Sequence, residues 1–255
     1  MKKVVAVIGS QSKNATYNAV QKMESNLMQY VDIEFEYIFL SEFHLEFCQG
    51  CKLCFEKGEQ YCPLKDDRDK LLEKLDNSDG VIFATPVYGF QVTARMKNFI
   101  DRSSYIFHRP CFFSKTYIAV VTQGVFGGRG VLKYLEFVGK RLGFEVIKGS
   151  CVRTSEPITD YQQKWIEKEM KKSAERFYKG LIQSKLSTPS FFSLILFRLI
   201  RTCLQFEDSC SRDFSYYNEK GWFHSDYYYE AKLGLIKKSA GNLCDRIAYT
   251  IRKNW

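Results

Sequence analysis

The chain of 255 residues is long enough for one large domain or for one domain with an appendage. Hydrophobic residues make up 45% of it and charged residues 26%, which is typical of a globular protein and excludes a disordered chain. The formal net charge of +9 favours partners that carry phosphate, but the lysines are spread along the chain, so we expect no nucleic-acid partner.

Two features of the sequence indicate where the protein works. The apolar run 4–8 is too short for the core of a signal peptide, and Arg198 interrupts the longest apolar stretch, 191–200, before it reaches the ~18 residues of a membrane span. The nine cysteines are an odd number, which in a reducing compartment favours metal or redox chemistry over disulfides. We therefore expect a cytoplasmic protein.

The first 182 residues alternate between strand and helix patterns. Short apolar or alternating runs predict strands at 4–8, 33–39, 80–84, 116–121 and 145–152. Helical spacing of apolar residues predicts helices at 14–30, 67–75, 93–104, 130–142 and 161–182. This alternation predicts an α/β fold, a five-stranded parallel sheet with helices on both faces. In such sheets, ligands bind beyond the carboxyl ends of the strands.

The alternation stops near Pro189. The stretch 191–203 has a helical, apolar pattern, the segment 220–229 is crowded with aromatic residues, and the tail is basic and amphipathic. We expect two parts, a domain at 1–188 and a helical, aromatic-rich extension at 189–255, because about 65 residues alone form only a marginal core. The extension could pack on the domain, on a second subunit or on a membrane surface, and we favour a subunit contact over a membrane. Trp222 is the residue expected to cover a neighbouring subunit's pocket.

The first loop, Gly9 to Thr16, follows the first strand and opens a helix. A phosphate there would meet free backbone N–H groups and the positive end of the helix dipole. The side chains of Ser10, Ser12, Asn14 and Thr16 add donors that suit the monophosphate of a mononucleotide. The loop matches neither the dinucleotide-binding nor the ATP-binding glycine pattern, and a plain capped helix start remains the alternative.

Two more loops follow the third and fourth strands. In the second loop, 85–102, Pro86 ends the strand, Gly89 permits a sharp turn, and Tyr88 can stack on a planar ring. The third loop, 122–130, has four glycines in nine residues, which indicates a close approach of the backbone to another group. A sheet-end turn and a surface loop are the alternatives for each loop alone, but all three lie at strand ends and together predict one site.

These three loops resemble those of the NAD(P)H-dependent FMN reductases of flavodoxin-like fold, over roughly residues 1 to 185. The resemblance implies that FMN is the cofactor, and the block 86–102 is its most specific part. Relatives often have arginine and glycine where this chain has Ser12 and Ala15, which leaves the individual phosphate contacts open. The implied contacts are Ser10, Ser12, Asn14, Ala15 and Thr16 at the phosphate, Pro86, Val87, Tyr88, Gly89 and Phe90 against the isoalloxazine ring, and Thr122, Gln123, Gly124 and Gly127 at its other edge.

Four cysteines, Cys48, Cys51, Cys54 and Cys62, form a C-x2-C-x2-C-x7-C run. Thiolates at such intervals can converge on one metal centre, and ferredoxin-type runs share this spacing. The run resembles that of the iron–sulfur flavoproteins, a branch of the same family, which implies a [4Fe–4S] cluster on these four residues. Other family members keep a similar loop without a cluster, followed by an aspartate pair such as Asp66-Asp67, so cluster and bare thiols both remain open, with zinc less favoured.

The resemblance implies an oxidoreductase that passes hydride from NAD(P)H through FMN to a quinone, a flavin, a nitro compound or an electron-carrier protein. The alternative is a flavodoxin-like or iron–sulfur electron carrier without NAD(P)H turnover, although flavodoxins are usually acidic and this chain is at +9. The three histidines share no spacing and no hydrolase motif is present, so we expect no catalytic side chain. Relatives are commonly oligomeric, which implies a homodimer or homotetramer.

Overall fold

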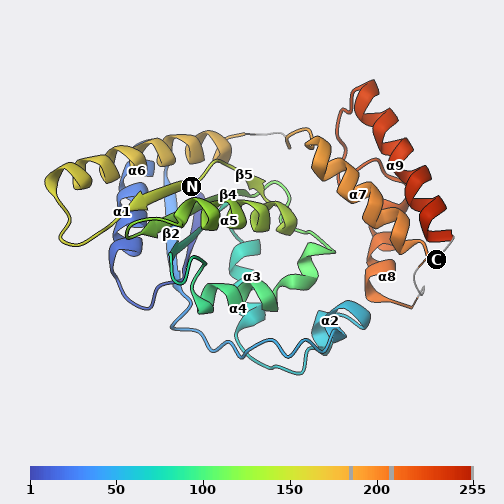
Figure 1. The fold of residues 1–255 in the computed structure, drawn as a ribbon, viewed down its shortest axis with the longest axis horizontal. Helices are drawn as coiled ribbons and strands as arrows, with labels where there is room; N and C mark the ends of the chain where they lie inside the picture. Colours follow the sequence, from blue (N-terminus) through green and yellow to red (C-terminus); the bar gives the residue numbers. More distant parts are fainter. Residues whose placement is uncertain (184–185, 207–209, 254–255) are drawn as a thin grey trace. The chain divides into compact units, whose positions relative to one another are not determined.

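The computed structural model describes residues 1–183, 186–206 and 210–253. It divides into two compact units (Figure 1). The first unit contains Met1–Gln49 and Leu64–Lys185, and the second contains Gly50–Pro63 and Leu186–Trp255. The cysteine-rich loop thus belongs largely to the same unit as the C-terminal extension.

The first unit is built on a parallel sheet of six strands. Its order is β2-β1-β3-β4-β5, with β6 also paired to β4. This is the flavodoxin-like order, which places a ligand site at the β1/β3 switch point and confirms the predicted fold class. The strands are β1 (Lys2–Ile8), β2 (Ile33–Phe39), β3 (Gly80–Pro86), β4 (Thr116–Gln123), β5 (Glu145–Val146) and β6 (Ser150–Arg153).

The single strand predicted at 145–152 is divided into β5 and β6. The backbone at Gly149 runs so close to β4 that a Cβ there would lie 2.3 Å from the carbonyl oxygen of Ala119. The N–H of Gly149 donates to Glu136 Oε1 at 2.9 Å, outside the sheet ladder. The apolar pattern of the sequence does not predict this break between β5 and β6.

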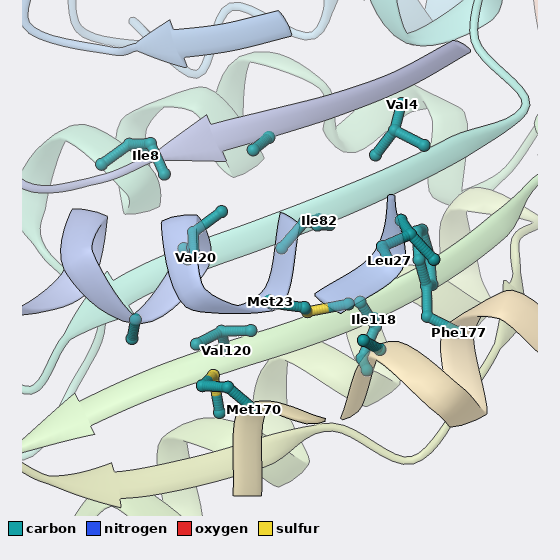
Figure 2. Close-up of a cluster of buried hydrophobic side chains, with 14 of the residues drawn as sticks. Val4, Ile8, Val20, Met23, Leu27, Ile82, Ile118, Val120, Met170 and Phe177 are labelled. Atoms are coloured by element: carbon teal, nitrogen blue, oxygen red, sulfur yellow. The ribbon is translucent and has the colours of Figure 1, made fainter. Parts of the chain in front are cut away.

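Helices cover both faces of the sheet. On one face, α1 (Ala15–Leu27) packs against α6 (Asp160–Leu181), and both contact β4. On the other face, α5 (Gly128–Leu142) packs on β4, where Gly139 lies against Tyr117. Figure 2 shows the resulting core between α1, α6 and the sheet, where Val4, Met23, Ile82 and Met170 are all fully buried. Each such side chain contributes about 1.5–3 kcal/mol through burial. The unit also contains α3 (Arg68–Asp76), α4 (Ala94–Arg102) and a short 3-10 helix at Ser104–Phe107.

The second unit is helical. It contains α7 (Phe191–Leu204), α8 (Arg212–Glu219) and α9 (Leu235–Lys253), with α7 packed on α9 and with α2 (Leu53–Glu56) from the cysteine loop packed on α8. Short 3-10 helices lie at Glu59–Tyr61 and Trp222–His224. Trp222 is buried in this unit and donates from Nε1 to the carbonyl of Tyr228 at 3.0 Å. Trp222 is thus buried by the aromatic cluster of its own chain, and its role at a neighbouring subunit's pocket stays a prediction.

The buried face of α7 contains two arginines beside its apolar residues Leu194 and Phe197. Arg198 and Arg201 point inward, where both bind the carboxylate of Asp245 on α9 at 2.6 Å. Phe192 and Leu199 instead stay exposed. Within the described ranges, no helix combines the length and hydropathy needed to cross a membrane.

Candidate functional site

The first loop leaves the start of α1 open. Asn14 occupies the N-cap position, but its side chain makes no cap hydrogen bond and reaches Ser12 Oγ instead, at 3.3 Å. Ser12 and Asn14 are exposed, while Ser10 is buried and donates to the carbonyl of Ser12 at 3.2 Å. The N–H groups of the first turn, beginning with Ala15, have no intrahelical acceptor and so remain available to an anion.

A buried hydroxyl pair holds this loop against the third loop. Thr16 Oγ1 and Thr122 Oγ1 lie 2.7 Å apart, and both residues are nearly inaccessible to solvent. Thr122 also accepts a hydrogen bond at its carbonyl from the N–H of Val87, at 2.8 Å. Through these two contacts of Thr122, the three loops are held together at the carboxyl ends of β1, β3 and β4.

Thr93 is the N-cap of α4 and also contacts the first loop. Its hydroxyl accepts from the N–H of Met96 at 3.3 Å and donates to the carbonyl of Gly9 at 2.9 Å. A Cβ at Gly9 would lie 2.8 Å from that hydroxyl, so the first loop needs glycine here. Thr93 therefore joins the first and second loops.

The second loop begins with a tight hairpin turn after β3. Tyr88 and Gln91 exchange two backbone hydrogen bonds of 3.0 Å, and the residues between them, Gly89 and Phe90, have φ values of 54° and 61°. This pair of positive φ angles is that of a type I′ turn. The turn directs the side chains of Tyr88 and Phe90 into solvent, where they are 60% and 64% exposed.

The third loop extends this exposed aromatic surface. The ring of Phe126, itself 67% exposed, lies 5.4 Å from the ring of Phe90 between centroids. A Cβ on Gly127, whose φ is 100°, would lie 3.0 Å from the Phe90 ring. We call Tyr88, Phe90, Val125 and Phe126 the ring platform. An open helix N-terminus beside such a platform suits a mononucleotide with a planar ring.

The remaining predicted contacts also lie at this sheet edge. Pro86 is the last residue of β3 and Gln123 the last residue of β4. The carbonyl of Gln123 accepts from the N–H of Thr154 at 2.8 Å, and that of Gly124 accepts from the Ser155 hydroxyl at 2.7 Å. These bonds anchor the third loop to the segment after β6.

A buried ion pair that the sequence did not identify fixes the chain ahead of the cysteines. Arg102 donates to both carboxylate oxygens of Asp66 and, at 2.8 Å, to the carbonyl of Glu46. Asn98 donates to the carbonyls of Leu45 and Glu46 at 3.1 and 3.2 Å. The spacing of Asn98 and Arg102, four residues apart on the buried face of α4, was the available signal.

The four cysteines of the run are divided between the units. Cys48 lies in the first unit, and Cys51, Cys54 and Cys62 lie in the second. No disulfide joins any of the nine cysteines. Across the part of the chain that the structure describes, no three Cys, His, Asp or Glu side chains come together as metal ligands. We derive no electron-transfer step through a cluster.

Comparisons with known proteins identify the family of the chain. Residues 2–156 match the profile of a family described as NADPH-dependent FMN reductase. The chain is 35% identical over 159 residues to an iron–sulfur flavoprotein of Archaeoglobus fulgidus, a match that covers 58% of this chain and 70% of that protein.

Two solved structures share the fold. A NAD(P)H:quinone oxidoreductase from Methanothermobacter marburgensis superposes with a TM-score of 0.54 at 16% identity, covering 68% of this chain and 95% of that one. RosB with bound 8-demethyl-8-formylriboflavin-5'-phosphate superposes with a TM-score of 0.57 at 12% identity, covering 92% of both chains.

Proposed function

Because the chain belongs to the NADPH-dependent FMN reductase family, and is thus an FMN-dependent oxidoreductase, we propose that it takes hydride from NAD(P)H and passes the electrons to a quinone, a flavin, a nitro compound or an electron-carrier protein. FMN, when bound, supplies the chemistry of accepting hydride and releasing electrons singly or in pairs. The protein supplies binding, orientation and shielding from water.

One observation carries this proposal: the open N-terminus of α1 lies at the same sheet edge as the ring platform. The first-turn N–H groups of α1, with Ser12 and Asn14, would hold the phosphate. The platform would pack against the isoalloxazine ring and exclude water from its face. No side chain is assigned as a general acid or base.

A second candidate is an electron carrier without NAD(P)H turnover. The cysteine run and the similarity to an iron–sulfur flavoprotein favour it. In that case the loop 48–62 would have to rearrange around a [4Fe–4S] cluster, and the positive φ angles at Gly50, Lys52 and Gly58 show that its backbone already turns sharply.

An absorption spectrum of protein purified without oxygen, with iron and acid-labile sulfide measured on the same sample, tests these candidates. The reductase is expected to show flavin bands that bleach when NADPH or NADH is added and return when a quinone follows. A carrier would retain the flavin bands in the presence of either nucleotide. Iron and sulfide at cluster stoichiometry would assign the cysteines as ligands, and a protein that cannot take up FMN would contradict both candidates.

The variant Ser12→Glu tests the phosphate loop. Its carboxylate would repel the FMN phosphate, so FMN affinity is expected to fall by about tenfold or more while riboflavin, which lacks the phosphate, binds as before. Ser25→Glu adds the same charge to an exposed position further along α1 and serves as the control. If the two variants bind FMN with equal affinity, the FMN phosphate does not bind at the first loop.

The cellular compartment of the protein is also a proposal. Nine cysteines without a disulfide favour a reducing compartment, and we propose the cytoplasm.

A further inference from the structure

The first turn of α1 is held differently from the first turns of four other helices. In α4, α6, α7 and α8, a threonine or serine at the N-cap position accepts a hydrogen bond from an N–H of the first turn. Asn14 occupies this position in α1, but its side chain makes no such bond. The N–H groups from Ala15 to Tyr17 therefore stay free for an anion, but the turn lacks the side chain that normally fixes it.

A buried hydroxyl pair provides the attachment instead. Thr16, the second residue of α1, is 1% exposed, and its Oγ1 lies 2.7 Å from the Oγ1 of Thr122, which is 2% exposed. Thr122 is itself held in the sheet, where it pairs with Val152 of β6 and where its carbonyl accepts from the N–H of Val87 at 2.8 Å. The pair thus ties the first turn of α1 to a strand without occupying any N–H that a phosphate needs.

The other polar side chains of the first loop bond within the loop. Ser10 is buried and donates its only hydroxyl hydrogen to the carbonyl of Ser12 at 3.2 Å, and Asn14 donates to Ser12 Oγ at 3.3 Å. Among the residues that the structure describes, the Thr16–Thr122 pair is the one side-chain hydrogen bond that joins the first turn of α1 to the sheet. The position of the free N–H groups therefore depends on this pair.

We propose that Thr122 is a positioning residue for the FMN phosphate and that it makes the protein prefer FMN to riboflavin. Acting through the Thr16 hydroxyl, it holds the first-turn N–H groups of α1 where they bind the phosphate, while its own side chain touches no part of the cofactor. Thr122 is thus assigned to the phosphate and not to the edge of the isoalloxazine ring. This inference rests on the proposed function, because it requires FMN to bind with its phosphate at the first loop.

The first test compares FMN with riboflavin, which lacks the phosphate. After removal of flavin, Thr122→Val is expected to bind FMN about tenfold more weakly than the unaltered protein in a fluorescence titration, with riboflavin affinity unchanged. Thr122→Ser keeps the hydroxyl and is expected to keep the FMN affinity. Thr116→Val removes a buried hydroxyl from the start of the same strand and is the control, with both affinities expected to stay unchanged.

Two results of this comparison would overturn the inference. One is an equal loss of affinity for both flavins in Thr122→Val, which would indicate a structural role or a contact with the ring. The other is an FMN affinity no lower than that of Thr116→Val. Thr122→Ala gives the same comparison if Thr122→Val does not fold.

The second test is a double-variant cycle on the same affinities. Because Thr122 acts through Thr16, Thr16→Val is expected to weaken FMN binding by the same factor, and the double variant is expected to bind FMN no more weakly than either single variant. Losses that multiply in the double variant would show that the two hydroxyls act separately, and the inference would be wrong.

Neither test depends on turnover. If neither NADPH nor NADH reduces the flavin while the cycle gives the expected result, the proposed reductase function fails and the role of Thr122 stands. If the unaltered protein binds FMN no more tightly than riboflavin, the phosphate is not held at the first loop and the inference fails, whatever the reductase assay shows.

Discussion

Asp66 and Arg102 are both almost completely buried, and their pairing determines how the chain approaches the cysteine loop. Burial acts to raise the pKa of the Asp66 carboxyl, but the hydrogen bonds from Arg102 and from the N–H groups of Glu46 and Arg68, with the charge of Arg102, outweigh it and lower that pKa below its ordinary value of 3.8. The ionised carboxylate is thus favoured in the folded chain.

The variant Asp66→Asn tests this pair. It removes the carboxylate that pairs with the buried guanidinium of Arg102, so the free energy of unfolding is expected to fall by about 3–5 kcal/mol in urea titrations. Asp101→Asn changes the same group in the exposed pair with Lys97 and is expected to have little effect. If the two variants were equally stable, the Asp66–Arg102 pair would not hold the segment before the cysteines.

The lowered pKa of Asp66 also makes the stability of the folded protein depend on pH. Because the folded-state pKa lies below the unfolded-state value, the contribution of Asp66 to stability is fully present above about pH 4 and is lost as the pH falls through the folded-state pKa. Below pH 4 the unaltered protein is therefore expected to lose more stability than Asp66→Asn does. Urea titrations at a series of acid pH values measure this difference.

At the scale of elements, the type I′ turn after β3 combines strain with exposure. A phenylalanine at φ 61° is unfavourable, since positive φ brings Cβ close to the backbone. The turn nevertheless places Phe90 where its ring meets that of Phe126 in the third loop. Strained backbone of this kind is typical of binding sites.

The variant Phe90→Gly separates strain from binding. Glycine relieves the positive φ, so stability is expected to stay the same or to rise by up to about 1 kcal/mol. Loss of the ring is expected to weaken FMN binding by about tenfold, measured by fluorescence titration, and Phe126→Ala is expected to do the same. Phe137→Ala removes an exposed ring on α5, outside the platform, and serves as the control. If Phe90→Gly lowers FMN affinity no more than Phe137→Ala does, the ring platform does not bind FMN.

At the scale of the whole molecule, the second unit has an apolar surface that its own packing does not cover. Phe192 and Leu199 are exposed on α7, and Ile236, Leu243 and Ile247 are exposed along α9. Such a surface marks an interface in ordinary proteins. We propose, as the sequence pattern suggests, that a second copy of the chain covers it.

The variant Leu199→Glu tests this interface. A carboxylate in a contact between copies is expected to shift the protein from an oligomer to a single chain in light scattering. Asn242→Glu adds the same charge at an exposed polar position of α9 and is expected to leave the mass unchanged. An unaltered protein with the mass of one chain would contradict the proposal.

Local sequence patterns predicted much of the first unit. The strands near 4–8, 33–39 and 80–84 and the helices of that unit follow from apolar periodicity and turn residues, with ends that differ by a few residues. The C-terminal extension is helical, as predicted. The packing of α2 on α8 could not be foreseen, because about 150 residues separate them and no local pattern encodes that contact.

The sequence by itself determined the parallel sheet, the three loops at its edge and the family to which they belong, because short-range periodicity and turn chemistry act within a few residues. Tertiary structure alone decided that Thr16 meets Thr122, that Arg102 is buried against Asp66, and that Arg129 and Arg153 line one cavity. These contacts join residues far apart in the chain, and only the stacking of strands and helices brings their side chains together.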